Sequence, residues 1–220
     1  MKQQNSKLLL SSITALCLLS LCAAELAAQT QRELKDVFKN DFKIGAALNR
    51  RQIFEEDTRG AEIVKKHFNS ITPENVLKWA LVHPEPDKYN FTATDRFVEF
   101  GEKHGMFIVG HTLVWHNQTP RWVFQNEKGE PVDRQTLLNR LREHIFTVVG
   151  RYKGRINGWD VVNEALNQDG TMRQSPWFKI IGEDYLARAF EFAHQADPAR
   201  NSITTIMTSS FQPNAQARLN

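Results

Sequence analysis

A carboxylate and an amide end an otherwise apolar stretch of this chain. Residues 159–164 read Trp-Asp-Val-Val-Asn-Glu, which is typical of a buried strand that opens into a pocket at Asn163 and Glu164. Apolar neighbours such as Trp159 would raise the pKa of the Glu164 carboxyl group. A carboxylic acid that stays protonated near neutral pH is a general acid, able to protonate the departing oxygen of a glycoside. The alternative for an isolated Asn-Glu pair is a surface glutamate that follows a strand.

Two upstream segments favour a site over that alternative. Residues 72–79 read Thr-Pro-Glu-Asn-Val-Leu-Lys-Trp, and residues 110–118 read Gly-His-Thr-Leu-Val-Trp-His-Asn-Gln. Each follows an expected strand, and the carboxyl ends of parallel strands gather at one rim. Carboxylate, amide, ammonium, imidazole and indole groups at one rim suit a neutral, hydroxyl-rich ligand with an apolar face.

Metal and nucleophile chemistry are the competing interpretations of these residues. His111, His116 and Glu74 could be metal ligands, but the two histidines are five apart and lack a His-Glu-x-x-His context. A serine nucleophile is disfavoured because no Gly-x-Ser-x-Gly is present, and Cys17 and Cys22 both lie in the amino-terminal apolar segment. We therefore expect neither a metal nor a cofactor.

The pattern around these segments predicts alternating strands and helices. The strands are apolar on both faces, which indicates a parallel α/β sheet. The pattern does not distinguish an open sheet from a closed barrel, although no Gly-x-Gly-x-x-Gly follows the first strand, as a dinucleotide-binding fold would require. The expected strands are 44–48, 68–72, 106–109 and 156–162, and the expected helices are 59–67, 92–105, 133–149 and 183–196, after a helical lead-in over 31–40.

Composition and charge exclude several classes of partner. The net charge of +3 is spread along the 220 residues, with no basic run that would indicate nucleic acid. Residues 1–28 are expected to be an export signal, because Lys2 and Lys7 precede an apolar core over residues 8–21. That core is shorter than the ~20 residues of a membrane span. We expect an exported protein, secreted or periplasmic, with no stable membrane span after signal removal.

Three segments together resemble a known family. Residues 72–79, 110–116 and 159–165 are similar to three motifs of the glycoside hydrolase family 10 endo-β-1,4-xylanases, in the family's order and at similar intervals. Residues 175–177 and 181–185 extend the similarity. The resemblance implies a (β/α)8 TIM barrel, with residues 29–200 as its amino-terminal part, and retaining hydrolysis of internal β-1,4-xylosidic bonds in xylan.

The resemblance also assigns roles to residues. Glu164 would be the general acid/base, and Asn163 would bind the 2-hydroxyl of the sugar being cleaved. Xylan or a xylo-oligosaccharide would be the partner of a monomer. A cellulase-like glycosidase and a non-catalytic xylo-oligosaccharide-binding fragment remain alternatives, although the His-Thr-Leu-Val-Trp-His stretch favours xylanase. The residues that would line the glycone subsites are Glu74, Asn75, Lys78, His111, Trp115 and Gln118.

The family's second carboxylate has no counterpart in the sequence. A retaining mechanism needs a nucleophile ~5–5.5 Å from the acid/base. The glutamates after Glu164 are Glu183 and Glu191, both in an expected helical segment. Only about four to five of the eight β/α units are expected within the chain, and we expect it to be inactive as it stands.

The last segment, residues 201–220, departs from the family pattern and carries a prediction. One back-translation of residues 201–208 gives, from its third base, Leu-Tyr-Tyr-Asn-Asp-Tyr-Asp, which matches the strand that the family places there. We predict that a frameshift near Arg200 replaces the fifth strand and ends translation early. Sequencing the DNA after the Arg200 codon checks this, and an alternative frame that closes at once would refute it.

Overall fold

The computed structural model describes residues 32–199 and 201–203, so the expected signal at 1–28 and most of 201–220 lie outside it. The chain divides into two compact units, residues 1–42 and 43–220. The described part of the first unit contains helix α2 (Leu34–Val37), which reduces the predicted lead-in over 31–40 to about one turn. Across the described ranges, no helix has the length and apolar content needed to cross a membrane.

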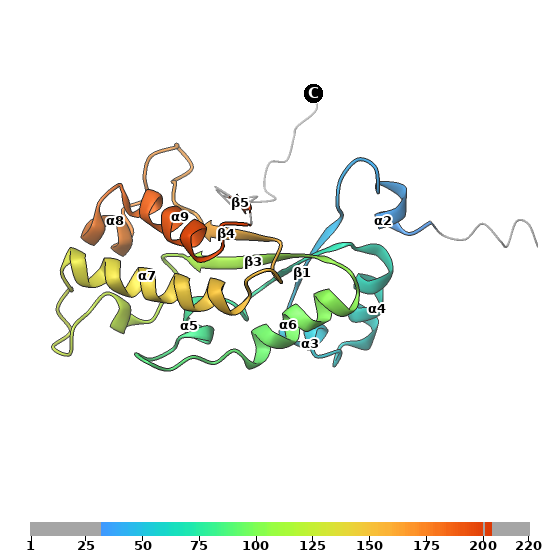
Figure 1. The fold of residues 1–220 in the computed structure, drawn as a ribbon, viewed down its shortest axis with the longest axis horizontal. Helices are drawn as coiled ribbons and strands as arrows, with labels where there is room; N and C mark the ends of the chain where they lie inside the picture. Colours follow the sequence, from blue (N-terminus) through green and yellow to red (C-terminus); the bar gives the residue numbers. More distant parts are fainter. Residues whose placement is uncertain (1–31, 200, 204–220) are drawn as a thin grey trace, which may run out of the picture. The chain divides into compact units, whose positions relative to one another are not determined.

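The second unit is built on a parallel sheet of five strands in the order β1-β2-β3-β4-β5 (Figure 1). Sequential order and parallel pairing mean that every strand begins at the same edge, as the predicted β/α repeat requires. The strands are β1 (Gly45–Leu48), β2 (Ser70–Pro73), β3 (Phe107–Val114), β4 (Gly158–Val162) and β5 (Asn201–Ile203).

Helices follow each of the first four strands and pack along the sheet (Figure 1). The predicted four are present, within a few residues of their expected bounds. Asp133 caps the longest of these helices, because its side chain accepts a hydrogen bond of 2.9 Å from the Thr136 amide. The helices are α3 (Arg50–Ile53), α4 (Thr58–His67), α5 (Trp79–Val82), α6 (Thr92–Lys103), α7 (Arg134–Arg151), α8 (Pro176–Ile181) and α9 (Tyr185–Ala196), with a 3₁₀ turn η1 (Arg121–Val123).

One predicted boundary is wrong. The strand expected at 106–109 continues to Val114, so His111 and Thr112 lie within β3 and not in a loop after it. Polar side chains at these positions suggested a loop, but both form hydrogen bonds with β4 and can therefore lie within a buried strand. The Thr112 hydroxyl donates to the Asp160 carbonyl at 2.9 Å, and His111 bonds the Asp160 side chain.

Close packing joins β3 to β4 at a glycine. Gly110 is the direct partner of Trp159 in the parallel register. A Cβ atom at Gly110 would lie 2.3 Å from Cε3 of the Trp159 ring, so the buried indole occupies the space that a side chain would need. Gly150, on the exposed side of α7, has no atom within 4 Å of the same position.

We predict that Gly110→Ala destabilises the chain by about 1–3 kcal/mol, because the added methyl overpacks the β3–β4 contact. Gly150→Ala is the matched control and is expected to stabilise the chain by about 0.5–1 kcal/mol through helix propensity. Urea unfolding of the two variants measures both effects. Equal stability of the two would show that the Trp159 contact is not tight.

Candidate active site

Glu164 occupies a constrained position just beyond β4. Its carboxylate Oε2 accepts a hydrogen bond of 2.9 Å from the indole Nε1 of Trp115, which follows β3. Its backbone φ is +54°, a left-handed conformation that non-glycine residues adopt at some cost in free energy. The Glu164 side chain is 18% exposed, so its carboxyl group is mostly shielded but reachable. The sequence predicted Trp159 as the indole beside this carboxylate, whereas in the structure the indole hydrogen-bonded to it is that of Trp115.

The backbone around Glu164 is held by a short hairpin. Arg173 Nε donates to the Glu164 carbonyl at 2.9 Å, and the Arg173 amide donates to the Ala165 carbonyl at 2.8 Å. An antiparallel bridge between Leu166 and Met172 closes the hairpin. These contacts fix the strained residue from outside the strand. The sequence carried no signal for Arg173, since a single arginine in a polar loop is normally solvated.

The backbone of Trp115 is fixed by two hydrogen bonds to its carbonyl group. Its carbonyl accepts hydrogen bonds from the Thr119 hydroxyl at 2.8 Å and from Trp177 Nε1 at 2.9 Å. Trp177 is buried and Trp115 is half-buried. The Trp115 indole is thereby oriented toward Glu164.

His116 is a neutral neighbour of the same carboxylate. Its Nε2 lies 3.8 Å from Glu164 Oε2 and 3.2 Å from the amide nitrogen of Asn117, which donates to it. Burial lowers the pKa of His116, and the Arg173 guanidinium lowers it further, against the opposing effect of Glu164. The imidazole therefore polarises the surroundings of Glu164 as an uncharged group and is not its ion-pair partner.

The predicted glycone residues form a connected group at the ends of β2 and β3. The Asn75 side-chain oxygen accepts hydrogen bonds of 3.3 Å from both Lys78 Nζ and Gln118 Nε2. Lys78 Nζ also lies 4.5 Å from the centroid of the Trp115 ring, a cation–π contact. Burial lowers the pKa of Lys78, while the nearby Glu74 and Glu164 carboxylates oppose this. The structure therefore brings these residues next to the Glu164 carboxylate.

His111 and Asn163 occupy different places at the same rim. His111 Nδ1 lies 2.7 Å from Asp160 Oδ2, because the two residues are direct partners in the β3–β4 register. The backbone N–H of Asn163 donates to the Val114 carbonyl at 2.9 Å. The side-chain amide of Asn163 makes no hydrogen bond to another described residue. Asp160, which orients His111, was missed by the sequence analysis although a carboxylate inside an apolar strand is itself a signal.

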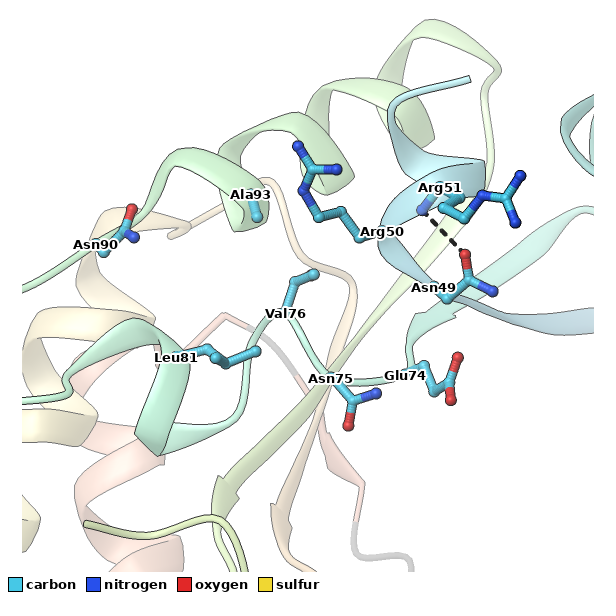
Figure 2. Close-up of a pocket in the computed structure, with 9 residues that line it drawn as sticks. All are labelled: Asn49, Arg50, Arg51, Glu74, Asn75, Val76, Leu81, Asn90 and Ala93. Atoms are coloured by element: carbon cyan, nitrogen blue, oxygen red, sulfur yellow. Dashed lines mark hydrogen bonds between the residues drawn. The ribbon is translucent and has the colours of Figure 1, made fainter. Parts of the chain in front are cut away.

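Glu74 and Asn75 also line a cavity of about 520 Å³ (Figure 2). Figure 2 shows Asn49, Arg50 and Arg51 on the segment after β1, with the Arg50 side chain running toward Ala93 and the Arg51 side chain running away from Val76 and Leu81. Glu74 is exposed, and its backbone amide donates to the Leu48 carbonyl at 2.9 Å. The structure thus places Glu74 at this cavity.

The remaining predicted features concern metals and the second carboxylate. Within residues 32–199 and 201–203, no three His, Cys, Asp or Glu side chains are grouped to hold a metal ion. Glu191 lies on α9, where it accepts a hydrogen bond of 2.9 Å from Arg188, and Glu183 is exposed between α8 and α9. Glu191 therefore lies in the predicted helix, whereas Glu183 lies in the turn that precedes it.

A buried aromatic stack supports the segment that carries Lys78. The Trp79 and His144 rings stack with centroids 3.6 Å apart, and the His83 and Tyr89 rings stack at 3.8 Å. The two histidines share one hydrogen bond, with 3.3 Å between their Nδ1 atoms. Such a bond needs one donor and one acceptor, so one Nδ1 atom carries a proton and the other does not. Burial lowers the pKa of His83 to about 4 and that of His144 well below its usual value.

Comparison with known proteins identifies this arrangement. Residues 33–206 match the model for glycosyl hydrolase family 10. The chain belongs to glycosyl hydrolase family 10. The chain is 46% identical over 187 residues to endo-1,4-beta-xylanase A of Xylanibacter ruminicola, covering 84% of the chain and 51% of that protein. It is 49% identical over 163 residues to endo-1,4-beta-xylanase B of Paenibacillus barcinonensis, covering 73% and 48%. The chain thus spans about half the length of these relatives.

Solved structures of family 10 confirm the predicted fold class. A GH10 endoxylanase from a sugarcane soil metagenome superposes with a TM-score of 0.75 at 47% identity, covering 78% of the chain and 50% of that structure. Xylanase 10B from Thermotoga petrophila RKU-1, in complex with xylobiose, superposes with a TM-score of 0.72 at 41% identity, covering 78% and 52%. The described strands and helices are therefore four β/α units and a fifth strand of a (β/α)8 barrel.

The neutral histidine pair predicts a pH dependence of stability. The unfolded chain binds a proton at His83 near pH 6.5, whereas the folded chain does so only near pH 4, so the free energy of unfolding falls as the pH drops through this window. The His83 contribution lost is about 3 kcal/mol at most. Urea unfolding at a series of pH values measures the slope. His83→Phe should reduce the slope, leaving the part that His144 contributes, whereas His194→Phe, at an exposed position on α9, should not. Equal slopes in both variants would refute the assignment.

Proposed function

We propose that this chain forms the acid/base half of an exported endo-1,4-β-xylanase site and binds xylan or xylo-oligosaccharides through its glycone residues. The observation that carries the proposal is the hydrogen bond from Trp115 to Glu164, which positions a shielded carboxyl group beside the Asn75–Lys78–Gln118 group. Family membership supports the reaction class, and the xylobiose complex of the Thermotoga petrophila enzyme supports the ligand class. The basic and apolar sequence of residues 1–28 supports export.

Each residue at this rim would have a different role in the reaction. Glu164 would donate its proton to the leaving glycosidic oxygen and then take one from the attacking water. The side-chain amide of Asn163, which has no hydrogen-bond partner among the described residues, would bind the hydroxyl next to the reacting carbon, where hydrogen bonds strengthen in the transition state. Lys78 and Gln118 would donate to hydroxyls of the preceding sugar, while Trp115 covers an apolar face.

A retaining reaction also needs a second carboxylate, at covalent-attack range of the sugar, which bonds to the reacting carbon in the first step and is released by water in the second. Glu183 and Glu191 belong to the helical layer and do not supply it. We therefore propose that the 220-residue chain binds xylo-oligosaccharides without hydrolysing them. Release of reducing sugar from xylan by the purified chain would contradict this part of the proposal.

Calorimetric titration of the purified chain with xylotetraose tests the binding function. The wild-type chain should give saturable heat. Lys78→Met should weaken binding about ten-fold or more, because a charged donor to the sugar hydroxyls is lost. Lys103→Met, at an exposed position in the last turn of α6, is the matched control and should bind as wild type.

Two outcomes would overturn this assignment. A folded chain that gives no saturable heat with xylotetraose is not a xylo-oligosaccharide-binding protein. Equal affinities of the Lys78→Met and Lys103→Met variants would remove Lys78 from the binding group. Titration with cellotetraose separates xylan from cellulose recognition, and tighter binding of the cello-oligosaccharide would favour the cellulase-like alternative.

A further inference from the structure

The short helix α5 (Trp79–Val82) connects the glycone residues to the buried histidine pair. Lys78 precedes its first residue as the N-cap, and His83 follows its last residue, with the His83 N–H donating to the Trp79 carbonyl at 2.7 Å. The Ala80 N–H of the same turn donates to the Gln118 carbonyl at 2.8 Å. Gln118 has a φ of +48°, a left-handed conformation that a non-glycine residue keeps only when its surroundings hold it. The positions of both Lys78 and Gln118 thus depend on α5.

Tertiary contacts, and not helix propensity, hold α5 in place. A helix of four residues forms a single turn, and an isolated turn is unstable because helix nucleation is unfavourable. The Trp79 side chain is 2% exposed, and its ring lies with its centroid 3.6 Å from that of His144 and 5.5 Å from that of Trp177. His144 comes from α7 and is fully buried. The His144 ring is therefore part of the surface on which α5 packs.

The histidine pair has no place for an added proton. Its internal hydrogen bond joins the Nδ1 atoms of His83 and His144 at 3.3 Å. The Nε2 atoms of both rings are buried and have no hydrogen-bond partner among the described residues. Protonation of the ring that donates the shared bond would bury an N–H at Nε2 without an acceptor, and protonation of the ring that accepts it would leave two N–H groups facing each other. Either change opposes the packed arrangement of α5.

The charged groups near the pair lie at a cavity of about 150 Å³ beside His83. Asp87 and Glu143 are exposed there, and Asp87 acts to raise the pKa of His83, but burial outweighs this effect and lowers the pKa to about 4. The Nη1 atom of Arg140 donates to the backbone carbonyls that end η1. The other face of His83 is covered by the Tyr89 ring, whose pKa is raised by burial, so its hydroxyl stays neutral. The cavity is lined by His83, Pro86, Asp87, Trp122, Arg140 and Glu143.

We propose that His83 and His144 are positioning residues that make sugar binding by Lys78 and Gln118 dependent on pH. While the pair is neutral, α5 stays packed on the aromatic stack and both glycone residues are held. When either ring takes up a proton, α5 leaves the stack and releases them. The inference rests on the proposed function, because it is there that Lys78 and Gln118 bind sugar hydroxyls. Protonation of the pair and binding of a xylo-oligosaccharide therefore oppose each other.

Native-state hydrogen exchange on the full 220-residue chain tests the proposal. The amides of Val82 and His83 donate within α5 and report its opening. Their opening ratio is the measured exchange rate divided by the rate of a free amide at the same pH, and it should rise about ten- to thirty-fold between pH 7 and pH 5. The sign follows because the opened turn binds a proton at His83 near pH 6.5 and the packed turn only near pH 4, so acid favours the opened form.

Two comparisons in the wild-type chain show whether α5 opens by itself and whether it holds the sugar site. The opening ratio at α5 should exceed that of amides in the middle of α7 at both pH values, because the single turn opens without the rest of the domain. Xylotetraose at about twenty times its dissociation constant should lower the α5 ratio about twenty-fold at pH 5, because only the packed form binds the sugar.

Variants isolate the contribution of each ring. His83→Asn keeps an amide near the position of Nδ1 but cannot take up a proton, so it should reduce the pH-dependent rise about three-fold or more and leave the part that His144 contributes. His144→Asn tests the other ring in the same way. His194→Asn, at an exposed position on α9, is the matched control and should keep the wild-type rise. Circular dichroism confirms that each variant is folded.

The outcomes separate this proposal from the one on which it rests. An α5 opening ratio that is equal at pH 7 and pH 5, or the same rise in all three variants, overturns the pH link while sugar binding stands. Equal opening ratios for α5 and the middle of α7 also overturn it, since the turn would then open only with the whole domain. A ratio that xylotetraose leaves unchanged, although calorimetry shows binding, removes α5 from the sugar site. Absence of saturable heat in calorimetry refutes the proposed function instead.

Discussion

The parallel register between β3 and β4 is the constraint on which the site depends. It sets His111 directly opposite Asp160 and Gly110 directly opposite Trp159, so one residue of slip would separate both pairs. The same register brings the segments that follow the two strands together, which lets the Trp115 indole reach the Glu164 carboxylate over 49 residues of sequence. The chemistry of the rim is therefore a consequence of strand pairing, since neither segment could position its side chains alone.

The two sides of the rim are positioned by different means. Glu164 is fixed through its backbone by Arg173 and through its carboxylate by Trp115, and Trp115 is itself fixed through its carbonyl. Asn75, Lys78 and Gln118 are linked mainly by longer hydrogen bonds between side chains. In the proposed function Glu164 would be a proton donor, which has to be held at one place to act on one bond, whereas groups that only bind hydroxyls tolerate looser positioning. The tighter constraint is found where the chemistry requires it.

Much of this arrangement could be predicted from sequence, because it depends on local patterns. The apolar run before Asn163 predicted β4, a helix was predicted at 133–149 where α7 lies, and both are present. The end of β3 could not be predicted, since His111 and Thr112 look like loop residues until their partners on β4 are known. The short helices α3 and α5 have four residues each, too few to show a helical period.

The sequence also did not predict the contacts that orient the site residues, because the partners are far apart along the chain. Arg173 and Asp160 act through a backbone carbonyl and a histidine ring, and no motif within either segment specifies those partners. The cavity next to Glu74 was also missed, because its lining comes from segments that only the folded sheet brings together. What remains hidden from sequence is thus the set of contacts that orients the side chains, while the types of the side chains themselves are visible.

The hairpin that holds Glu164 also limits how this loop can vary in length. Its two arms are joined by the Leu166–Met172 bridge and by hydrogen bonds between Asn167 and Thr171, and Gly170 turns the chain with a φ of +82°. Residues 168–170 are exposed and lie outside the bridge. Natural insertions, epitope tags or fused modules should therefore be accommodated at this tip, where they leave the acid undisturbed, and excluded from the arms.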